Sequence, residues 1–305
     1  MKFSVMITTR NRCEDLRRTC ARLFELQPAP DEVLICADGC TDATTEVVRQ
    51  EYSDFQLIEN NPALGSVASR DRMLRLVTGD VVVSLDDDSY PLADDFFARL
   101  PLLFAAHPAA AVLTFPELRE GGVFAGDSKT DQSTGHYVAA YANCAAAMRR
   151  EFYLRQPGFP CFFSHMYEEP DYALQCYAAG AAVWFEPSLV IRHHLSNVQR
   201  QPVRRHHQNA RNELWSVWMR CPVSHLPFVS IFRIWRQFRY ACLEGFGWAI
   251  REPLWWFAAL RGIGKCMAAR VPVPWARYYA WMRLARSPIA DANDLEARFS
   301  PDSLQ

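Results

Sequence analysis

The stretch VVVSLDDDSYP, residues 81–91, carries both a strand signal and a ligand-site signal. Its apolar run of β-forming residues predicts a buried strand. Three adjacent carboxylates, Asp86, Asp87 and Asp88, follow that run directly. They repel one another, and a shared divalent cation would offset the repulsion, with Mg²⁺ or Mn²⁺ suited to oxygen ligands. The residues alone also fit a solvated acidic turn in which an Asp caps the next helix.

Short apolar runs alternate with helical patterns on both sides of this stretch. Strands are predicted at residues 3–7, 32–37, 55–59, 81–85 and 110–115, and helices at 12–26, 41–51, 66–77 and 94–106. Alternation at this spacing predicts an α/β, Rossmann-like fold, in which a mostly parallel sheet has helices on both faces. Sheets of this kind bind ligands at the carboxyl ends of their strands.

Polar residues of unusual type follow three of the predicted strands. Thr8, Thr9 and Arg10 come after the first strand, Asp38 after the second, and the Asp triplet after the fourth. We therefore expect these loops to converge on one edge of the sheet and to form a ligand site there.

The segment NPALGSVASRDRML, residues 61–74, is a candidate for phosphate binding. Gly65 and several small residues stand at a predicted helix start, and Arg70 follows one turn later. A helix start of this kind accepts a phosphate group or a closely approaching backbone. An ordinary turn with a surface arginine gives the same pattern.

Beyond residue 115 the sequence predicts a further set of elements. They are a Gly-rich polar loop at 116–137 that could close over a ligand, strands at 137–148, 181–186 and 189–194, and helices at 149–155 and 168–180. The helix at 168–180 has Pro170 in its first turn and Gly180 at its end. Its first acids, Glu168, Glu169 and Asp171, either complement the helix dipole or supply a catalytic carboxylate.

Charge and aromatic residues divide the chain of 305 residues into parts. The net charge is −11 over residues 1–191 and +13 over 192–290, and eight of the nine Trp residues lie at 215–281. We therefore predict an α/β domain over residues 1–200, a basic, aromatic-rich helical region over 201–290 and a polar tail over 291–305.

The cysteines and the apolar stretches indicate the compartment. Ten Cys residues are scattered without a CxxC pair or a zinc-ligand spacing, and no secretory signal opens the chain. This pattern predicts reduced thiols and a cytoplasmic protein. The apolar stretches fall short of the roughly 20 residues that a membrane-spanning helix needs.

The C-terminal third combines aromatic and basic residues in two helical patterns. Phe228, Ile231, Trp235 and Phe238 recur at helical spacing, and Trp255, Ala259, Ile263 and Met267 share one side of the next helix. Basic helices with interfacial aromatic residues fit a surface that lies on anionic lipid. The composition also fits helices packed on the catalytic domain, a dimer contact or nucleic-acid binding, but no nucleic-acid module is recognisable. We expect a membrane surface as partner and no nucleic acid, and we leave the oligomeric state open.

Five motifs in this chain resemble those of a known family in their order and spacing. They are ITTRNR, ADGCTD, NPALGSVASRDR, LDDDSYP and EEPDYALQCYAAG. They resemble glycosyltransferase family 2, the inverting nucleotide-sugar transferases of the GT-A fold, over about residues 3–200. The chain looks most similar to the bacterial rhamnosyltransferase-like members, and RVPVPWARYYAWMRL resembles their C-terminal part.

The resemblance implies nucleotide-binding roles for several residues. Asp38 resembles the carboxylate that holds the nucleotide base, and Thr8, Thr9 and Arg10 resemble the loop beside it. Arg70 resembles the arginine that meets the nucleotide or its phosphates.

The resemblance also implies a metal site. Asp86 and Asp88 resemble the outer members of the DxD motif, with Asp88 as the direct metal ligand and Asp87 as the middle residue beside the nucleotide. His193 or His194 could complete the metal shell or contact a phosphate, although a single histidine is more often structural.

The general base would lie at the start of the helix at 168–180. The family has Glu-Asp at this point, whereas this chain has Glu168-Glu169, so that Glu169 takes the position of the base and Asp171 is the alternative. Arg211, in the family-like segment RNELWSVWM, could face the phosphates or the membrane.

These observations lead us to expect an inverting, metal-dependent glycosyltransferase. It would move a sugar from a nucleotide-diphosphate donor, with dTDP- or UDP-sugars favoured, to a glycan or lipid-linked acceptor of bacterial surface polysaccharide. It would lie on the cytoplasmic face of the cell membrane. A sugar-1-phosphate nucleotidyltransferase is the first alternative, but such enzymes open with a Gly-rich phosphate loop and ITTRNRCEDL contains no Gly. A membrane-bound scaffold with a relic transferase domain is the second, and the intact acids count against it.

Overall fold

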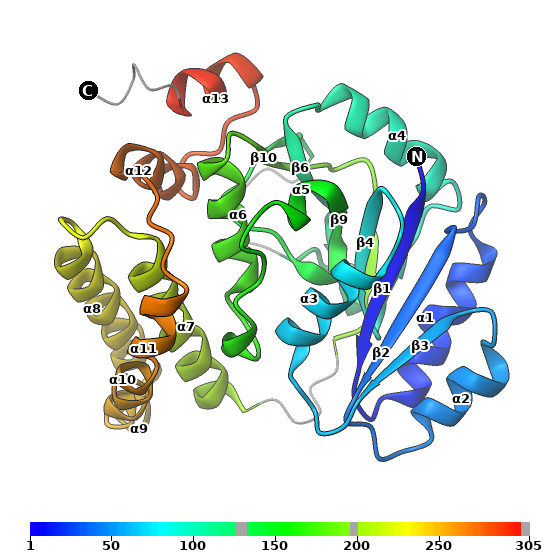
Figure 1. Cartoon of the computed structure of the whole chain (residues 1–305), viewed down its shortest axis with the longest axis horizontal. Coiled ribbons are helices and arrows are strands. Elements are labelled where there is room, and N and C mark those ends of the chain that lie inside the picture. The colour runs from blue at the N-terminus through cyan, green and yellow to red at the C-terminus, as the bar shows by residue number, and fades with distance from the viewer. Residues whose placement is uncertain (126–132, 196–200, 300–305) are drawn as a thin grey trace.

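An eight-stranded sheet forms the centre of the N-terminal part in the computed structural model, which describes residues 1–125, 133–195 and 201–299 (Figure 1). Its strands lie in the order β3-β2-β1-β4-β9-β6-β10-β8. Their bounds are β1 (Phe3–Thr9), β2 (Glu32–Asp38), β3 (Gln56–Asn60), β4 (Val81–Asp86), β6 (Ala110–Thr114), β8 (His136–Tyr137), β9 (Ala146–Arg149) and β10 (Ala182–Phe185). The pairs β1–β2, β1–β4, β2–β3 and β6–β10 are parallel, which confirms the predicted α/β fold.

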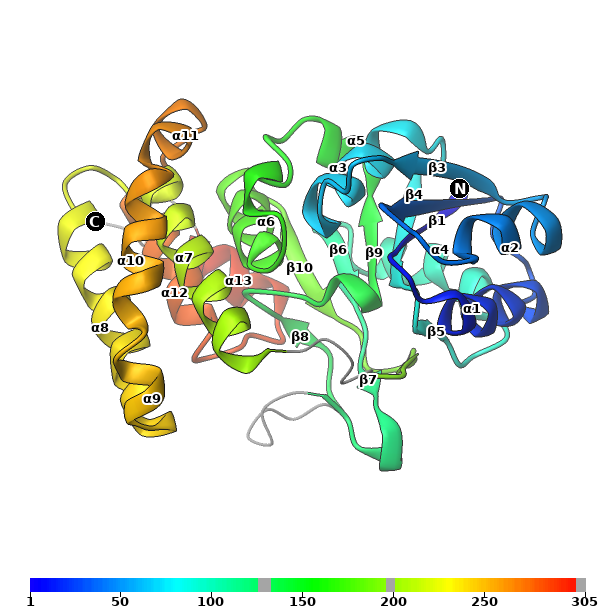
Figure 2. The same cartoon turned by 90° about the horizontal axis from the view of Figure 1, so that it is seen from below.

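Helices cover both faces of this sheet, with α3 and α5 on one side and α1 and α4 on the other (Figures 1 and 2). Their bounds are α1 (Cys13–Glu25), α2 (Thr44–Glu51), α3 (Ser66–Leu76), α4 (Phe96–Ala106), α5 (Arg150–Leu154) and α6 (Glu168–Ala178). In α1, Leu16, Cys20 and Leu23 are buried and follow the spacing of one helix face. Because the sheet is covered on both sides, its central strands are buried along their length, and their sequences are continuous apolar runs.

A second, three-stranded sheet positions the Asp triplet. It consists of β5 (Ser89–Pro91), β11 (Ile191–His193) and β7 (Glu117–Leu118), with β11 in the middle. The antiparallel register of β5 and β11 pairs Ser89 with His193. The chain therefore brings residues that are about a hundred positions apart to the same edge of the main sheet.

The structure corrects the strand that the sequence predicts at residues 137–148. Only the two ends of that segment are strands, β8 and β9, and the 3₁₀ turn η2 (Asn143–Ala145) precedes β9. β9 runs antiparallel between β4 and β6, so the chain has to reverse before it enters the sheet. The loop predicted at 116–137 contains β7, the 3₁₀ turn η1 (Glu120–Gly122) and the start of β8, while its residues 126–132 lie outside the described residues.

The C-terminal region is helical, as the sequence predicts. Its helices are α7 (Pro202–Arg220), α8 (Leu226–Glu244), α9 (Phe246–Ala249), α10 (Glu252–Arg261), α11 (Ile263–Ala268), α12 (Trp275–Leu284) and α13 (Ala292–Phe299). α8 and α10 pack on α7 and form an outer layer on the side away from the sheet (Figure 1). The predicted boundary at residue 200 falls in 196–200, outside the described residues. The predicted polar tail contains α13, whose Phe299 stacks on Tyr177 with ring centroids 4.8 Å apart.

One of the two predicted aromatic stripes is wrong. Trp255 and Ala259 are buried against α7, where the Trp215 indole donates a hydrogen bond to the Ala259 carbonyl at 2.9 Å. The chain also breaks between α10 and α11 at Gly262, whose position leaves no room for a Cβ beside Trp215. The stripe therefore cannot continue to Ile263 and Met267 on one straight helix.

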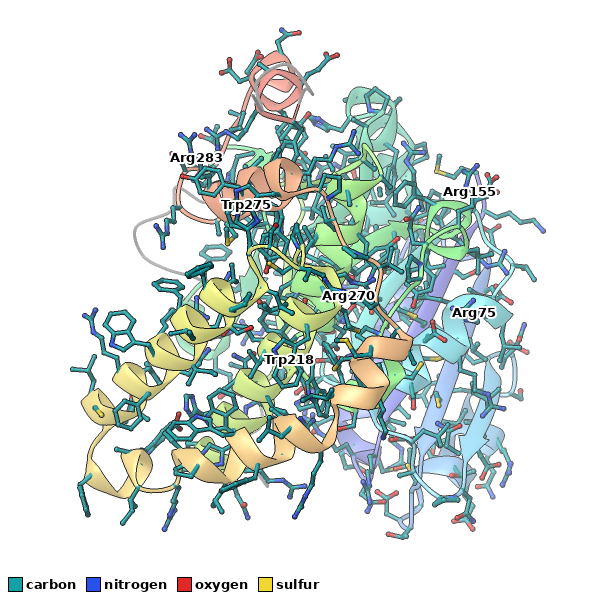
Figure 3. All side chains as sticks on the ribbon, turned by 60° about the vertical axis from the view of Figure 1, so that its left-hand side comes forward. Arg75, Arg155, Trp218, Arg270, Trp275 and Arg283 are labelled. Carbon is teal, nitrogen blue, oxygen red and sulfur yellow. The ribbon has the colours of Figure 1, made fainter. Side chains whose placement is uncertain are left out.

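The exposed apolar side chains of the outer layer are more numerous than the sequence predicts. They include Phe228, Ile231, Trp235, Leu243, Phe246, Ile250, Leu254, Phe257 and Leu260. Figure 3 shows this layer with its side chains, in a view that is rotated from that of Figure 1 so that α8 and α10 face the reader. Among the described helices, none has both the length and the apolar character needed to cross a bilayer.

Candidate active site

A cavity of about 880 Å³ opens at the carboxyl ends of β1 and β4, between the sheet and the start of α6. Residues from distant parts of the chain line it, and they include Arg10, Arg12, Glu14, Arg70, Asp86, Glu117, Asn143, Cys144, Met166, Glu168, Glu169, His193, Arg205 and Asn209. Five of these residues, Arg10, Arg70, Asp86, Glu169 and His193, belong to the predicted site. We call this cavity the active pocket.

The other predicted site residues do not line the active pocket. They are Thr8, Thr9, Asp38, Asp87, Asp88, Asp171 and His194. Most of them are buried, and their contacts, described below, show what each one holds in place.

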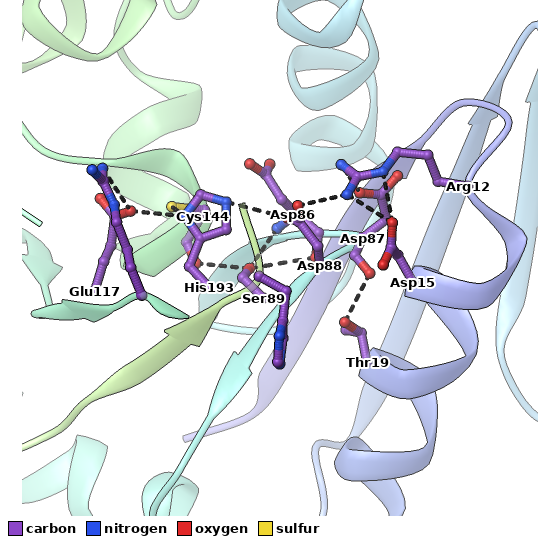
Figure 4. A network of polar contacts seen from close by, with 12 residues as sticks. Arg12, Asp15, Thr19, Asp86, Asp87, Asp88, Ser89, Glu117, Cys144 and His193 are labelled. Atoms are coloured by element: carbon purple, nitrogen blue, oxygen red, sulfur yellow. Dashed lines mark hydrogen bonds and ion pairs between the residues drawn. The ribbon is translucent and has the colours of Figure 1, made fainter. Parts of the chain in front are cut away.

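The Asp triplet divides between the pocket and the interior. Asp86 is partly exposed and lines the pocket, whereas Asp87 and Asp88 are buried. Arg12 contacts both buried members, with Nη1 2.9 Å from Asp87 Oδ1 and Nη2 2.7 Å from Asp88 Oδ2 (Figure 4). Burial raises the pKa of Asp87 to about 7, although Arg12 acts to lower it. An arginine that the sequence analysis missed therefore neutralises part of the triplet.

Three side chains, that of Asp86 among them, could share a cation. Asp86, Cys144 and His193 each place one ligand atom within 4.8 Å of the others. His193 Nε2 also lies 3.2 Å from Asp88 Oδ1, a buried oxygen that accepts no well-formed hydrogen bond within the described residues. Carboxylate and imidazole groups gathered in this way suit a divalent cation such as Mn²⁺. The residues present thus fit a metal ion.

Glu117 and Ser89 hold this cluster in position. His193 Nδ1 lies 2.7 Å from Glu117 Oε2, and the two carboxylates beside the ring raise the pKa of His193 to about 9 against the lowering effect of burial. Ser89 Oγ donates to the Cys144 carbonyl at 3.0 Å and accepts from the Asp86 backbone N–H at 2.8 Å. Cys144 and Glu117 carry no local sequence signal, since they reach the cluster only through the pairing of distant strands.

His194 points to a different partner from His193. Its Nε2 lies 2.9 Å from the Tyr90 hydroxyl, and its backbone N–H donates to the Asp88 carbonyl at 2.8 Å. His194 thus supports the β5–β11 sheet, and its predicted place beside the metal has no geometric support.

Arg70 links the Asp triplet to the start of α6. It is buried, and it donates hydrogen bonds to Asp86 and, at 3.2 Å, to Glu168 Oε1. Asn143 Nδ2 donates to the same Glu168 oxygen at 3.1 Å. Arg70 therefore lies at the pocket, as predicted, but its charge is already shared between two carboxylates.

Glu169 is the carboxylate of α6 that is best placed for proton transfer. It is half-buried and lines the active pocket in the first turn of α6. Burial and the neighbouring Glu168 raise the pKa of Glu169, while Arg70 acts to lower it. A carboxylate with a raised pKa accepts a proton more readily near neutral pH than an ordinary glutamate does.

Asp171 is held away from the pocket. Its two oxygens accept hydrogen bonds from Ser216, Gln175 and twice from Arg220, at 2.7 to 3.1 Å. The side chain is fully buried and joins α6 to α7. Because these donors occupy both oxygens, the arrangement does not support Asp171 as the base.

The turn before Glu169 has an unusual backbone. Ser164, Met166 and Tyr167 have positive φ values of 62°, 73° and 71°, which non-glycine residues rarely adopt. The buried amide of Asn212 on α7 donates to the carbonyls of Phe163, His165 and Met166 at 3.2, 2.8 and 2.8 Å. We call residues 164–167 the strained turn. Asn212, which the sequence analysis missed, fixes it directly in front of the α6 carboxylates.

Its neighbour Arg211 has no part in the active pocket. The guanidinium lies over the Trp215 ring, 4.3 Å from the centroid, and donates to the Phe163 carbonyl at 3.2 Å. The structure therefore does not support the prediction that Arg211 faces the phosphates.

Asp38 shapes a loop instead of lining the pocket. Its carboxylate accepts hydrogen bonds from Asn60 Nδ2 and from the backbone N–H groups of Leu64 and Gly65, at 2.8 to 2.9 Å. These bonds lower its pKa against the raising effect of burial. Gly65 has a φ of 94°, and a Cβ there would lie 2.6 Å from the Ser164 carbonyl oxygen. Asp38 thus fixes the close approach of the loop before α3 to the strained turn.

The loop after β1 contributes Arg10 to the pocket. Arg10 is exposed there, whereas Thr9 is buried and its Oγ1 has no hydrogen-bond partner within the described residues. Thr8 is half-buried, and its position in β1 pairs with Asp86 of β4.

The sequence and the fold are similar to those of known proteins. The family described as glycosyl transferase family 2 matches residues 4–157. No curated protein sequence matches the chain. A solved structure of Staphylococcus aureus TarS 1-349 in complex with UDP-GlcNAc is 16% identical, covers 98% of this chain and 90% of its own, and has a TM-score of 0.61.

Two further solved structures have the same fold. Mannosyltransferase PcManGT from Pyrobaculum calidifontis, in complex with GDP-Man and Mn²⁺, is 17% identical, with 94% of this chain and 87% of that chain covered and a TM-score of 0.58. GalNAc-T7 with UDP, GalNAc and Mn²⁺ is 14% identical over 73% of this chain, with a TM-score of 0.58, and this chain spans 48% of its length. At such identities the likeness shows the fold.

Proposed function

Because the chain belongs to glycosyl transferase family 2 and is therefore a glycosyltransferase, we propose that it moves a sugar from a nucleotide-diphosphate donor to an acceptor hydroxyl with inversion at the anomeric carbon. The observation that carries this proposal is that one pocket holds a half-buried carboxylate with a raised pKa, Glu169, together with the Asp86–His193 cluster. The first group suits proton removal and the second suits a diphosphate.

Glu169 acts as the general base in this proposal. It takes the proton from the acceptor hydroxyl, whose oxygen forms a bond to the anomeric carbon. The bond from that carbon to the diphosphate oxygen breaks, and the electron pair leaves with the nucleotide diphosphate. Attack from the side opposite the leaving group inverts the carbon. Arg70 and Arg10 lie along the same pocket and offer positive charge to the diphosphate.

The residues that would hold a divalent cation are Asp86, Asp88 and His193, with Cys144 beside them. Such a cation, Mg²⁺ or Mn²⁺, would neutralise charge on the diphosphate. Glu117 orients His193 through its contact with Nδ1.

The nucleotide would lie along the loops after β1 and β2. Arg10 contacts it directly, while Thr8, Thr9 and Asp38 act by holding the loops that surround it. Asp87, buried beside Arg12, keeps the triplet at the edge of β4. We propose a dTDP- or UDP-sugar as donor and a glycan or lipid-linked acceptor of bacterial surface polysaccharide. The resemblance of the motifs to rhamnosyltransferase-like members supports this choice.

The C-terminal helical region, residues 201–290, would hold the enzyme on the cytoplasmic face of the membrane. Its outer layer exposes apolar side chains next to exposed basic ones, which include Arg236, Arg239, Arg251, Arg261 and Lys265. This charge is complementary to anionic lipid, and amphipathic helices of such composition lie in a membrane interface.

Thermal unfolding with UDP, dTDP, GDP and CDP, each with and without Mn²⁺, tests the donor site. A ligand at a hundred times its Kd adds about 2.7 kcal/mol to stability, so binding shifts the midpoint visibly. We expect one nucleotide to stabilise the protein only when Mn²⁺ is present. A stabilisation that is equal with and without metal would contradict the cation site.

The variant Glu117→Gln refines this experiment. Outer partners of metal ligands typically contribute about 10–100-fold in metal affinity, so the Mn²⁺ concentration for half the shift should rise by that factor.

The release of pyrophosphate when the protein is given dTTP or UTP and a sugar 1-phosphate would instead indicate a nucleotidyltransferase.

A further inference from the structure

A second cavity adjoins the active pocket on the side of the C-terminal helices. It measures about 650 Å³ and lies between α7, α8 and α9. Met166, Arg205 and Asn209 line both cavities, so the two are neighbours that share these residues. The remaining lining residues are Pro202, His206, Gln237, Tyr240 and Trp248. We call this cavity the side groove.

Three aromatic rings from three elements meet in the side groove. The His206 ring lies 5.4 Å from the Tyr240 ring and 5.6 Å from the Trp248 ring, and Tyr240 and Trp248 are 6.1 Å apart in an edge-to-face arrangement. Glu252 fixes His206 through a contact of 2.8 Å between Oε1 and Nε2. Tyr240 and Trp248 nevertheless keep exposed surface. The three rings thus form a preformed aromatic cluster in which Tyr240 and Trp248 keep surface for a ligand.

Two amide side chains, Asn209 and Gln237, line the side groove together with the polar groups of Arg205, His206 and Tyr240. Asn209 is half-buried and lies where the two cavities meet, so its amide is within reach of a ligand in either one. Gln237 donates from Nε2 to Glu213 Oε2 at 2.6 Å, which leaves its carbonyl oxygen as an acceptor. Within the described residues, no carboxylate lines the groove.

Aromatic faces with neutral amides are suited to a sugar ring. The C–H faces of a pyranose pack on aromatic rings, and its hydroxyl groups exchange hydrogen bonds with amides. An alkyl chain would leave the amides unpaired, which costs affinity. Ligand sites commonly combine an apolar wall with a few polar groups that fix orientation, as this groove does.

The position of the groove relative to the active pocket fits an acceptor. The Asp86–His193 cluster belongs to the sheet side, whereas α7, α8 and α9 lie beyond α6 on the side away from the sheet (Figures 1 and 2). In an inverting transfer the acceptor approaches from the side opposite the leaving diphosphate. Met166, in the strained turn that precedes Glu168 and Glu169, forms part of both cavities.

We propose that the side groove is the acceptor subsite, and that it binds a sugar ring of a glycan acceptor between Trp248, Tyr240 and Asn209. This inference rests on the proposed function, because it assigns the second substrate of the same reaction. The exposed Leu243 and Phe246 lie near the groove in sequence, on α8 and α9, so that a lipid carrying the glycan would meet the outer layer.

Saturation-transfer difference NMR on the full chain tests the proposal directly. The probes are the methyl glycosides of rhamnose, glucose, galactose and N-acetylglucosamine, each with the nucleotide and Mn²⁺ that stabilise the protein. We expect the C–H protons of at least one glycoside to receive saturation. Trp248→Ala should weaken that binding by about tenfold, which corresponds to a loss of about 1.4 kcal/mol of binding free energy.

Two controls separate the possible outcomes. Trp235→Ala removes an exposed tryptophan of α8 that does not line the groove, so the glycoside signal should stay unchanged. The nucleotide-dependent melting shift should be unchanged in Trp248→Ala, which also shows that this variant folds. If Trp248→Ala does not fold, Asn209→Ala serves as the second variant and should reduce the signal in the same way.

The proposal is overturned if the wild type binds its nucleotide but none of the glycosides. It is also overturned if the glycoside signal is unchanged in folded Trp248→Ala or Asn209→Ala protein. Failure of the nucleotide itself to bind would instead contradict the proposed function. The donor and acceptor assignments therefore fail through different measurements.

Discussion

Glu169 is the residue whose chemistry is most directly testable. A general base must be ionised, and the pKa of Glu169 is raised by burial and by Glu168. The value of kcat/KM for transfer should therefore fall as the pH drops through this raised pKa. An ordinary glutamate has a pKa of about 4.3, so the fall should begin at a higher pH than it would with such a residue. Glu169→Gln should lower kcat by about 10²–10⁴ and remove this acidic limb from a pH–rate profile.

A matched variant makes that measurement specific. Glu14 lines the same pocket, but its side chain is 78% exposed and lies on α1. Glu14→Gln should leave the acidic limb where it is in the wild type. Full transfer activity in Glu169→Gln would show that another group takes the proton.

The individual site residues differ in how far the sequence could predict them. The Asp triplet, Arg70 and Glu169 carry signals because each stands at a strand end or a helix start. Arg12, Cys144 and Glu117 could not be recognised, because their roles come from contacts with residues that lie far away along the chain. The choice between Glu169 and Asp171 also needed the structure, since the partner Arg220 lies on another helix.

At the level of elements, the strained turn depends on α7 for its conformation. Three non-glycine residues with positive φ are costly, by about 1–3 kcal/mol each, and persist only where the surroundings hold them. The Asn212 amide donates to the carbonyls of His165 and Met166 in the strained turn and to that of Phe163 just before it. Asn212→Ala should lower the free energy of unfolding by about 1–3 kcal/mol, as measured by urea denaturation, because buried carbonyls lose their donor.

The same variant should affect catalysis apart from donor binding. Loss of the amide should displace Glu169 and lower kcat, while the nucleotide-dependent melting shift remains. Gln208→Ala is a suitable control, since Gln208 is a half-buried amide of the same helix and lies outside the active pocket. The free energy of unfolding of Gln208→Ala should stay within about 0.5 kcal/mol of that of the wild type. An equal loss in both variants would contradict a specific role for Asn212.

Most of the elements follow from the sequence, and the exceptions have a common cause. The strands β1, β2 and β4 could be predicted because both faces of the sheet are covered and their runs are mostly apolar. The strand at 137–148 and the stripe from Trp255 to Met267 were wrong for tertiary reasons. β9 enters the sheet antiparallel, and α7 buries one side of α10 before the helix ends at Gly262.

For the whole molecule, the proposed association with a membrane can be tested on the outer layer. Phe228, Phe246 and Leu254 are 75%, 80% and 64% exposed, so changing all three to Ser should leave the fold intact. We expect the wild type to sediment with vesicles that contain anionic lipid, and this triple variant to remain in the supernatant at any salt concentration.

A basic triple variant separates the electrostatic contribution. Arg239, Arg251 and Arg261 are exposed, and each basic residue near an anionic surface contributes about 1 kcal/mol. Changing the three to Gln should reduce vesicle binding mainly at low salt, and vesicles of neutral lipid should show no difference between this variant and the wild type. If the wild type binds neither kind of vesicle and forms a dimer in solution, the outer layer is instead a contact between two copies of the chain.

The cavity that spans the sheet and α7 has a consequence for how such enzymes diversify. The groups proposed to handle the nucleotide and the proton come from residues before 196, whereas most of the side groove comes from residues 202–248. If the side groove is the acceptor subsite, mutations in the C-terminal helices would alter which glycan is recognised while the inherited transfer chemistry stays intact. Exchange of this region between relatives would give a route to new linkages, provided that the strained turn and the contacts of Asp171 with Ser216 and Arg220 match on both sides.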